Sequence, residues 1–119
     1  MTPRFALALS ASLGFLGVAL GAFGAHGLEE TLARNGTAET WRTAVFYHLV
    51  HAVVLFVLAE RRPVATGPWL AFFAGILIFS GSLYILSVTG LKWLGAITPL
   101  GGVSLLIGWL WLALKGGQS

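Results

Sequence analysis

The sequence predicts an all-α integral membrane protein, a four-helix bundle with short loops and a short interfacial helix between spans one and two. Hydrophobic residues make up 57% of the 119 positions, and charged residues make up only 9%. A soluble domain carries about 25% charged residues. The mean hydropathy is +0.88, and four nearly uncharged stretches are each about twenty residues long, enough to cross a bilayer. So few polar side chains cannot cover a water-facing surface, which places the chain in a membrane.

The first span is predicted over residues 5–25, an uncharged stretch. As a helix it would be about 30 Å long, which matches the hydrocarbon core of a bilayer. A cleaved signal peptide is the alternative, because Arg4 precedes the stretch and small residues end it. The apolar part of a signal peptide is usually only about 7 to 15 residues long, which favours the span.

Residues 26–42 form the connection to the second span and hold three of the four acidic residues. Leu28 and Leu32 are four positions apart, which predicts one or two helical turns lying at the membrane surface. The pair Asn35–Gly36 predicts the end of this short helix, and Thr37 is the expected N-cap of the helix that follows.

The remaining spans are predicted over residues 41–59, 69–89 and 94–114, separated by short polar or glycine-containing turns. Pro99 falls inside the last of them, where it removes a backbone donor. A helix that begins at Pro99 would be only about 24 Å long. We therefore prefer a kinked span that covers the full stretch.

Four spans place both termini on one side of the membrane. The basic residues divide four to three between the two sides, as Arg4, Arg61, Arg62 and Lys115 against Arg34, Arg42 and Lys92. The positive-inside rule therefore predicts cytoplasmic termini. The net charge is only +3 and the basic residues are scattered singly, which excludes nucleic acid as a partner and leaves the lipid bilayer.

Small residues are expected to let the helices approach one another closely. In lipid the association of helices depends on such packing, because the hydrophobic effect no longer drives it. Pairs of small residues four positions apart recur in the first, third and fourth spans. The glycines predicted to mediate packing are Gly14, Gly17, Gly21, Gly75 and Gly108.

The polar residues inside the spans form two stripes. His48 and His51 share one face of the second span, and Ser80, Tyr84 and Ser87 share one face of the third. Thr98 adds a hydroxyl in the fourth span. Hydrogen bonds between the stripes are the favoured interpretation. The alternative is a cofactor site, haem or a metal, that uses these histidines with His26 as a third, since intramembrane ionisable groups often mark function.

Other signals are weaker. Glu39 and Arg42 are three apart and predict a local ion pair. The tryptophans are expected at the membrane interface or against lipid, namely Trp41, Trp69, Trp93, Trp109 and Trp111. There are no cysteines, no carboxylate within a span, and no phosphate-binding, serine-hydrolase, zinc-protease or glycosidase pattern. We therefore expect no enzymatic activity and no catalytic residue.

Several segments together resemble a known family. They cover residues 21–28, 41–52, 79–86 and 95–102, followed by Gly108 and Trp109. In these the chain resembles the domain of unknown function 423 family, which is similar to transmembrane protein 256 of animal mitochondria. The resemblance implies a compact four-helix protein of the membrane, the inner membrane in a Gram-negative bacterium, and it implies no activity.

Three hypotheses for the function follow. The leading one is a non-enzymatic helix-packing module that acts as a homo-oligomer or as an accessory subunit of a larger membrane complex. The second is a haem- or metal-binding module that uses His48 and His51. The third is a small oligomeric channel or carrier, with the polar stripe lining the path and the Pro99 break acting as a hinge.

Overall fold

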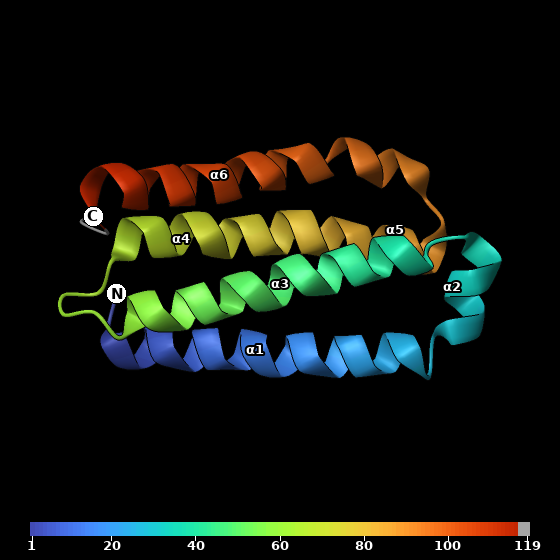
Figure 1. Cartoon of the computed structure of the whole chain (residues 1–119), viewed down its shortest axis with the longest axis horizontal. Coiled ribbons are helices and arrows are strands. Elements are labelled where there is room, and N and C mark those ends of the chain that lie inside the picture. Colours follow the sequence, from blue (N-terminus) through green and yellow to red (C-terminus); the bar gives the residue numbers. More distant parts are fainter. Residues whose placement is uncertain (117–119) are drawn as a thin grey trace.

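The computed structural model describes residues 1–116, and these fold into the predicted all-α membrane bundle, with no strand among them (Figure 1). Four helical segments are long and apolar enough to cross a bilayer, Pro3–Ala25, Ala38–Ala59, Thr66–Thr89 and Lys92–Lys115. The elements are α1 (Pro3–Ala25), α2 (Glu29–Asn35), α3 (Ala38–Ala59), α4 (Thr66–Gly75), the π-helix η1 (Ile76–Ser80), α5 (Gly81–Thr89), the 3-10 helix η2 (Lys92–Ala96) and α6 (Thr98–Lys115).

The spans lie side by side in the order α1, α3, α4–α5 and α6 (Figure 1). The start of α1 and the end of α6 lie at one end of the bundle, and α2 crosses the opposite end. In this arrangement α1 and α6 are the outer helices. Only 17% of the most apolar stretch of each is buried within the chain, compared with 39% in each of the two central spans. The outer helices therefore offer most of their surface to the bilayer or to other proteins.

The short surface helix forms where the charge pattern predicts it. Its C-cap is Gly36, whose φ of 66° is the left-handed conformation that glycine adopts without strain. Thr37 is the N-cap residue of α3, but its side chain caps nothing. Instead the Thr37 hydroxyl donates to the Ser87 carbonyl oxygen at 2.7 Å, and the Asn35 amide donates to the same oxygen at 3.1 Å. These bonds fix α2 to the end of α5.

The preference for a kinked fourth span is wrong. The α-helix begins at Thr98, so that Pro99 lies in its first turn, where a missing N–H removes no helical hydrogen bond. The preceding residues 92–96 form η2, a tighter 3-10 helix. Both the Ile97 amide and the Thr98 hydroxyl donate to the Leu94 carbonyl oxygen, which joins η2 to α6. The span reaches its full length through this change of helix type.

Small residues do bring helices together. A Cβ added at Gly17 would lie 2.6 Å from Cδ2 of Leu49, and one added at Gly21 would lie 3.2 Å from Cγ1 of Val45, so α1 and α3 are in close contact there. Gly14 differs, because an added Cβ would meet no atom within 4 Å. The expectation that Gly14 mediates packing is therefore wrong within a single chain.

Small residues of α4 and α6 each lie against a large side chain of the other helix. A Cβ added at Gly75 would overlap Leu105, and a Cβ added at Gly108 would lie 2.7 Å from Cε1 of Phe72. Between these two contacts the Ser104 hydroxyl donates to the Ala71 carbonyl oxygen at 2.7 Å. The close approach of the two backbones thus permits a hydrogen bond that longer side chains would prevent.

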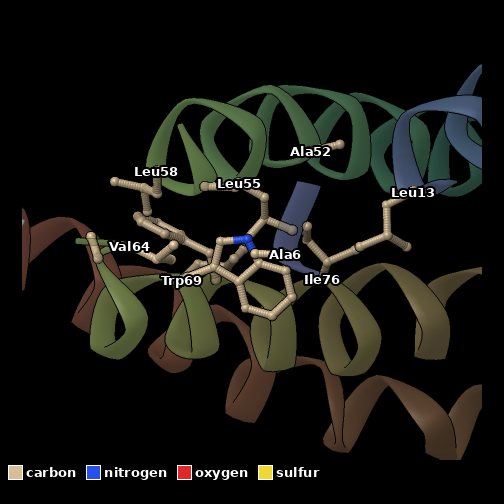
Figure 2. Close-up of a cluster of buried hydrophobic side chains, with 12 residues drawn as sticks. Ala6, Leu13, Ala52, Leu55, Leu58, Val64, Trp69 and Ile76 are labelled. Atoms are coloured by element: carbon tan, nitrogen blue, oxygen red, sulfur yellow. The ribbon is translucent and has the colours of Figure 1, made fainter. Parts of the chain in front are cut away.

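The apolar core lies between α1, α3 and α4. Figure 2 shows Trp69 of α4 among Ala6 of α1 and Leu55 and Leu58 of α3. Trp69 is 1% exposed, and its indole N–H donates to the Ser10 hydroxyl at 3.0 Å. A buried indole fills a large volume and needs one acceptor for its single donor, and both requirements are met here.

The expectation that Trp41 and Trp69 contact lipid is therefore wrong. Trp41 is also buried, 4% exposed, and its indole N–H donates to the Leu20 carbonyl oxygen at 3.0 Å. Space for the ring exists because Gly24 has no side chain. Trp93 and Trp109 differ, since they are 62% and 45% exposed.

We predict that Gly101→Ala destabilises the bundle and that Gly102→Ala does not. A Cβ at Gly101 would overlap the backbone of Phe79 in η1, which cannot rotate away, whereas one at Gly102 would lie 3.7 Å from the Phe79 ring, an ordinary contact. Overpacking of this kind costs about 1 to 3 kcal/mol. Unfolding by sodium dodecyl sulfate, followed by circular dichroism in micelles, measures both variants. Equal stability of the two would contradict the contact between α6 and η1.

Candidate functional site

His48 joins three spans through hydrogen bonds. It is buried in the middle of α3, where Nε2 lies 2.8 Å from the Leu13 carbonyl oxygen of α1 and Nδ1 lies 2.7 Å from the Tyr84 hydroxyl of α5. A carbonyl oxygen only accepts, so Nε2 carries the proton and donates. In the neutral ring Nδ1 then accepts from the Tyr84 hydroxyl. Both nitrogens of His48 are therefore used within the bundle.

His51 connects α3 to α6, and the donor and acceptor roles of its two ring nitrogens are the reverse of those in His48. The Trp109 indole N–H donates to Nε2 of His51 at 3.0 Å, and an indole can only donate. The proton of the neutral ring is therefore on Nδ1, which lies 2.8 Å from the Tyr47 carbonyl oxygen and donates to it. The two imidazoles hold different tautomers, and neither retains a free ring nitrogen.

The structure brings together only part of the predicted polar set. Tyr84 reaches His48, but the Ser80 hydroxyl donates to the Ala44 carbonyl oxygen at 2.8 Å. Thr98 lies 2.6 Å, oxygen to oxygen, from Ser82, which links α6 to α5. The Ser87 hydroxyl is buried and has no hydrogen-bond partner within residues 1–116. Of the stripe on the third span, Ser80 and Tyr84 thus bond to α3, and Ser87 does not.

His26 does not join the other two histidines. It is the C-cap residue of α1, and it is exposed at the end of the bundle where α2 begins. Across residues 1–116, no three His, Asp or Glu side chains gather into a set that could hold a metal ion. Glu39 and Arg42 do form the expected ion pair, and both side chains are exposed.

Several hydrogen-bond partners were not predicted from the sequence, because they are tryptophans or lie at the turn between α2 and α3. Trp109 faces His51 across 58 positions of sequence, and Trp69 faces Ser10 across 59. A serine in the middle of an apolar span was the available signal for the second pair, since a hydroxyl in lipid needs a partner. No comparable signal links Asn35 or Thr37 to the third span.

Two cavities open beside this polar set. A cavity of about 450 Å³ lies between α3, η1 and α6, beside His51 and three aromatic rings, those of Tyr47, Phe79 and Trp109. A larger one of about 740 Å³ lies between α1, α2 and α3, near the end of the bundle that α2 crosses. At the first cavity the Trp109 indole N–H bonds to His51, whereas the Tyr47 hydroxyl has no hydrogen bond within residues 1–116.

Residues 20–102 match the family model described as "Protein of unknown function (DUF423)". The chain belongs to this family. It is 50% identical over 113 residues to the UPF0382 membrane protein YwdK of Bacillus subtilis, with 89% of this chain and 90% of the relative covered. It is 42% identical over 113 residues to the UPF0382 inner membrane protein YgdD of Escherichia coli K12, with 92% and 86% covered. No solved structure matches the chain.

This membership confirms the resemblance, and together with the four apolar helices it identifies an integral membrane protein. The family match includes His26, both intramembrane histidines and the hydroxyl residues of the third span. The first 19 residues of the chain lie outside the match. Relatives that cover about nine tenths of this chain include part of α1 as well. The family is one of unknown function and assigns no activity to these residues.

We predict that Tyr84→Phe destabilises the bundle while Tyr47→Phe does not. The first variant leaves Nδ1 of His48 without a donor in a region without water, whereas the Tyr47 hydroxyl has no protein partner to lose. Hydrogen bonds between membrane helices contribute about 0.6 kcal/mol on average, with a maximum of about 1.7 kcal/mol.

The measurement is a double-mutant cycle of Tyr84→Phe with His48→Leu, read from unfolding in micelles. If the two residues interact as described, Tyr84→Phe costs nothing further once His48 is replaced. Additive costs, or an equal loss for Tyr47→Phe, would contradict the pairing.

Proposed function

We propose that this chain is a non-enzymatic interaction module that self-associates in the bilayer through the outer face of α1. The supporting observation is a line of exposed residues, spaced by four and three positions and mostly small, along that face. Its members are Ala8, Ser12, Phe15, Ala19 and Ala22. Within residues 1–116 all five are exposed.

The spacing and the size of these residues suit contact with another helix. Residues spaced by four and three positions lie along one side of a helix, and small side chains allow a second backbone to approach closely. The Ser12 hydroxyl donates to the Ala8 carbonyl oxygen of the same helix at 2.7 Å, so it does not require water. Phe15, 78% exposed, is the one large side chain and would fill the space beside a neighbouring helix.

The other outer helix has a different character, which directs the proposal to α1. One line of exposed positions on α6 carries only large branched aliphatic side chains, namely Leu100, Val103, Leu106, Leu110 and Leu114. Such side chains cover the backbone and match the acyl chains of lipid. The contrast favours α6 as a lipid-facing edge and α1 as the contact with a second copy.

The hydrogen bonds of the interior favour an interaction module over the other two hypotheses. A haem or metal would have to displace a hydrogen bond from whichever nitrogen of His48 or His51 it took. For a channel, the Ser80 and Tyr84 hydroxyls would have to line a path, but they bond to α3. We also propose cytoplasmic termini, on the charge bias described above.

Cysteine cross-linking tests this proposal directly, since the chain has no cysteine of its own. Copies inserted with the same orientation would pack α1 against α1 in parallel, so each position of the face would meet itself. We predict that Ala19→Cys forms a disulfide-linked dimer when membranes are oxidised with copper phenanthroline, and that Leu106→Cys on α6 does not.

A second variant makes the result specific. Adding Ala22→Leu to the Ala19→Cys chain should suppress the cross-link, because a larger side chain on the same face separates the two helices. The proposal is wrong if Leu106→Cys cross-links as efficiently as Ala19→Cys, or if the Ala22→Leu change has no effect.

A further inference from the structure

The larger cavity is shaped by three elements. Gly21, Gly24 and Ala25 form its wall on α1, and none of them has a side chain beyond Cβ. Leu32 of α2 closes the end, and α3 forms the opposite wall. The volume of about 740 Å³ is within the range of about 300 to 1,000 Å³ that ligand sites occupy.

The depth of the cavity corresponds to one leaflet of a bilayer. Along α3 it is lined from Ala38, at the first turn, to Leu49. These eleven steps rise about 16 Å, which is half of the hydrocarbon thickness of about 30 Å. The cavity therefore runs from the membrane surface to the middle of the bilayer, as a lipid acyl chain does.

The walls are apolar below the surface. Val45, Phe46 and Leu49 line the deep part on α3. Trp41 also lines it, but its indole N–H is bonded to the Leu20 carbonyl oxygen, so it offers only the ring. An alkyl chain meets no polar group there that needs a partner.

The mouth of the cavity carries charges of both signs on different elements. Glu29 is exposed in the first turn of α2, and Arg42 lies on α3 with its side chain 68% exposed. Arg42 pairs with Glu39, but a guanidinium has five N–H donors and can bind a phosphate as well. Glu29 and Arg42 are the two charged residues that line the cavity, so its mouth presents one carboxylate and one guanidinium.

This charge pattern selects among lipid headgroups. A phosphate can bond to Arg42, and an ammonium group attached to it can bond to Glu29. An anionic headgroup without an ammonium would place its charge beside an unpaired carboxylate. We propose that this cavity is a binding site for a zwitterionic phospholipid with a primary ammonium, such as phosphatidylethanolamine.

Native mass spectrometry of the full chain, delipidated in detergent and titrated with matched phosphatidylethanolamine and phosphatidylglycerol, tests the site. The wild type should bind phosphatidylethanolamine more tightly. Glu29→Gln should weaken phosphatidylethanolamine binding about tenfold, the effect of losing one charged hydrogen bond, and leave phosphatidylglycerol binding no weaker. Arg42→Gln should weaken both, because both lipids contain the phosphate.

The matched controls lie on α2, outside the cavity. Glu30→Gln and Arg34→Gln remove the same charges from exposed positions that do not line it and should leave both affinities unchanged. Ala25→Leu, at an exposed position of α1 that lines the cavity, should fill it and weaken the binding of both lipids, with folding checked by circular dichroism.

The proposal is overturned if phosphatidylglycerol binds as tightly as phosphatidylethanolamine to the wild type. It is equally overturned if Glu29→Gln behaves as Glu30→Gln does, which would indicate only a general effect of surface charge. Failure of the cross-linking experiment on α1 would not affect this result, since the cavity lies on the side of α1 that faces α2 and α3.

Discussion

The absence of water from the hydrocarbon core is the constraint on which this structure depends. A polar side chain in that region has to find its partner on the protein, and the nearest acceptors are the carbonyl oxygens and side chains of neighbouring helices. Trp41, Trp69 and His48 each bond to α1, and Trp109 bonds to His51 on α3. Because the hydrophobic effect does not drive these helices together, such bonds and close packing decide which helices are neighbours.

The hydrogen bonds in turn require small residues beside them. His48 reaches the Leu13 carbonyl oxygen next to Gly17, where an added Cβ would lie 3.3 Å from Cδ2 of the imidazole. Trp41 reaches the Leu20 carbonyl oxygen across Gly24, which leaves the space for its ring. In both cases a glycine of α1 and a polar aromatic residue of α3 form one contact. The same principle applies at the seam of α4 and α6, where the Ser104 hydroxyl bonds to the Ala71 carbonyl oxygen and Gly75 and Gly108 allow close approach.

Much of the fold was predictable, because hydropathy and charge determine which segments enter a bilayer. The four spans, the surface helix and the pairing of Glu39 with Arg42 follow from local patterns. The partners of His51 and Trp69 did not, since they depend on the rotation of helices that are distant in sequence. Hydropathy is also the same for a tryptophan that faces lipid and for one in the core. Likewise, a cluster of small residues does not tell which face of a helix is occupied, so that Gly14 was assigned to a contact that the chain does not make.

We propose that the intramembrane histidines are structural connections, each fixed in one tautomer by its hydrogen bonds to neighbouring residues. Solid-state ¹⁵N NMR of histidine-labelled protein in lipid bilayers measures this directly, with His48→Leu to assign the signals. The structure predicts a proton on Nε2 of His48 and on Nδ1 of His51, with the His51 signal altered by Trp109→Phe and the His48 signal unaffected. Two identical tautomers, or ring nitrogens whose shifts move when haem or a divalent metal is added, would contradict the account and favour a cofactor site.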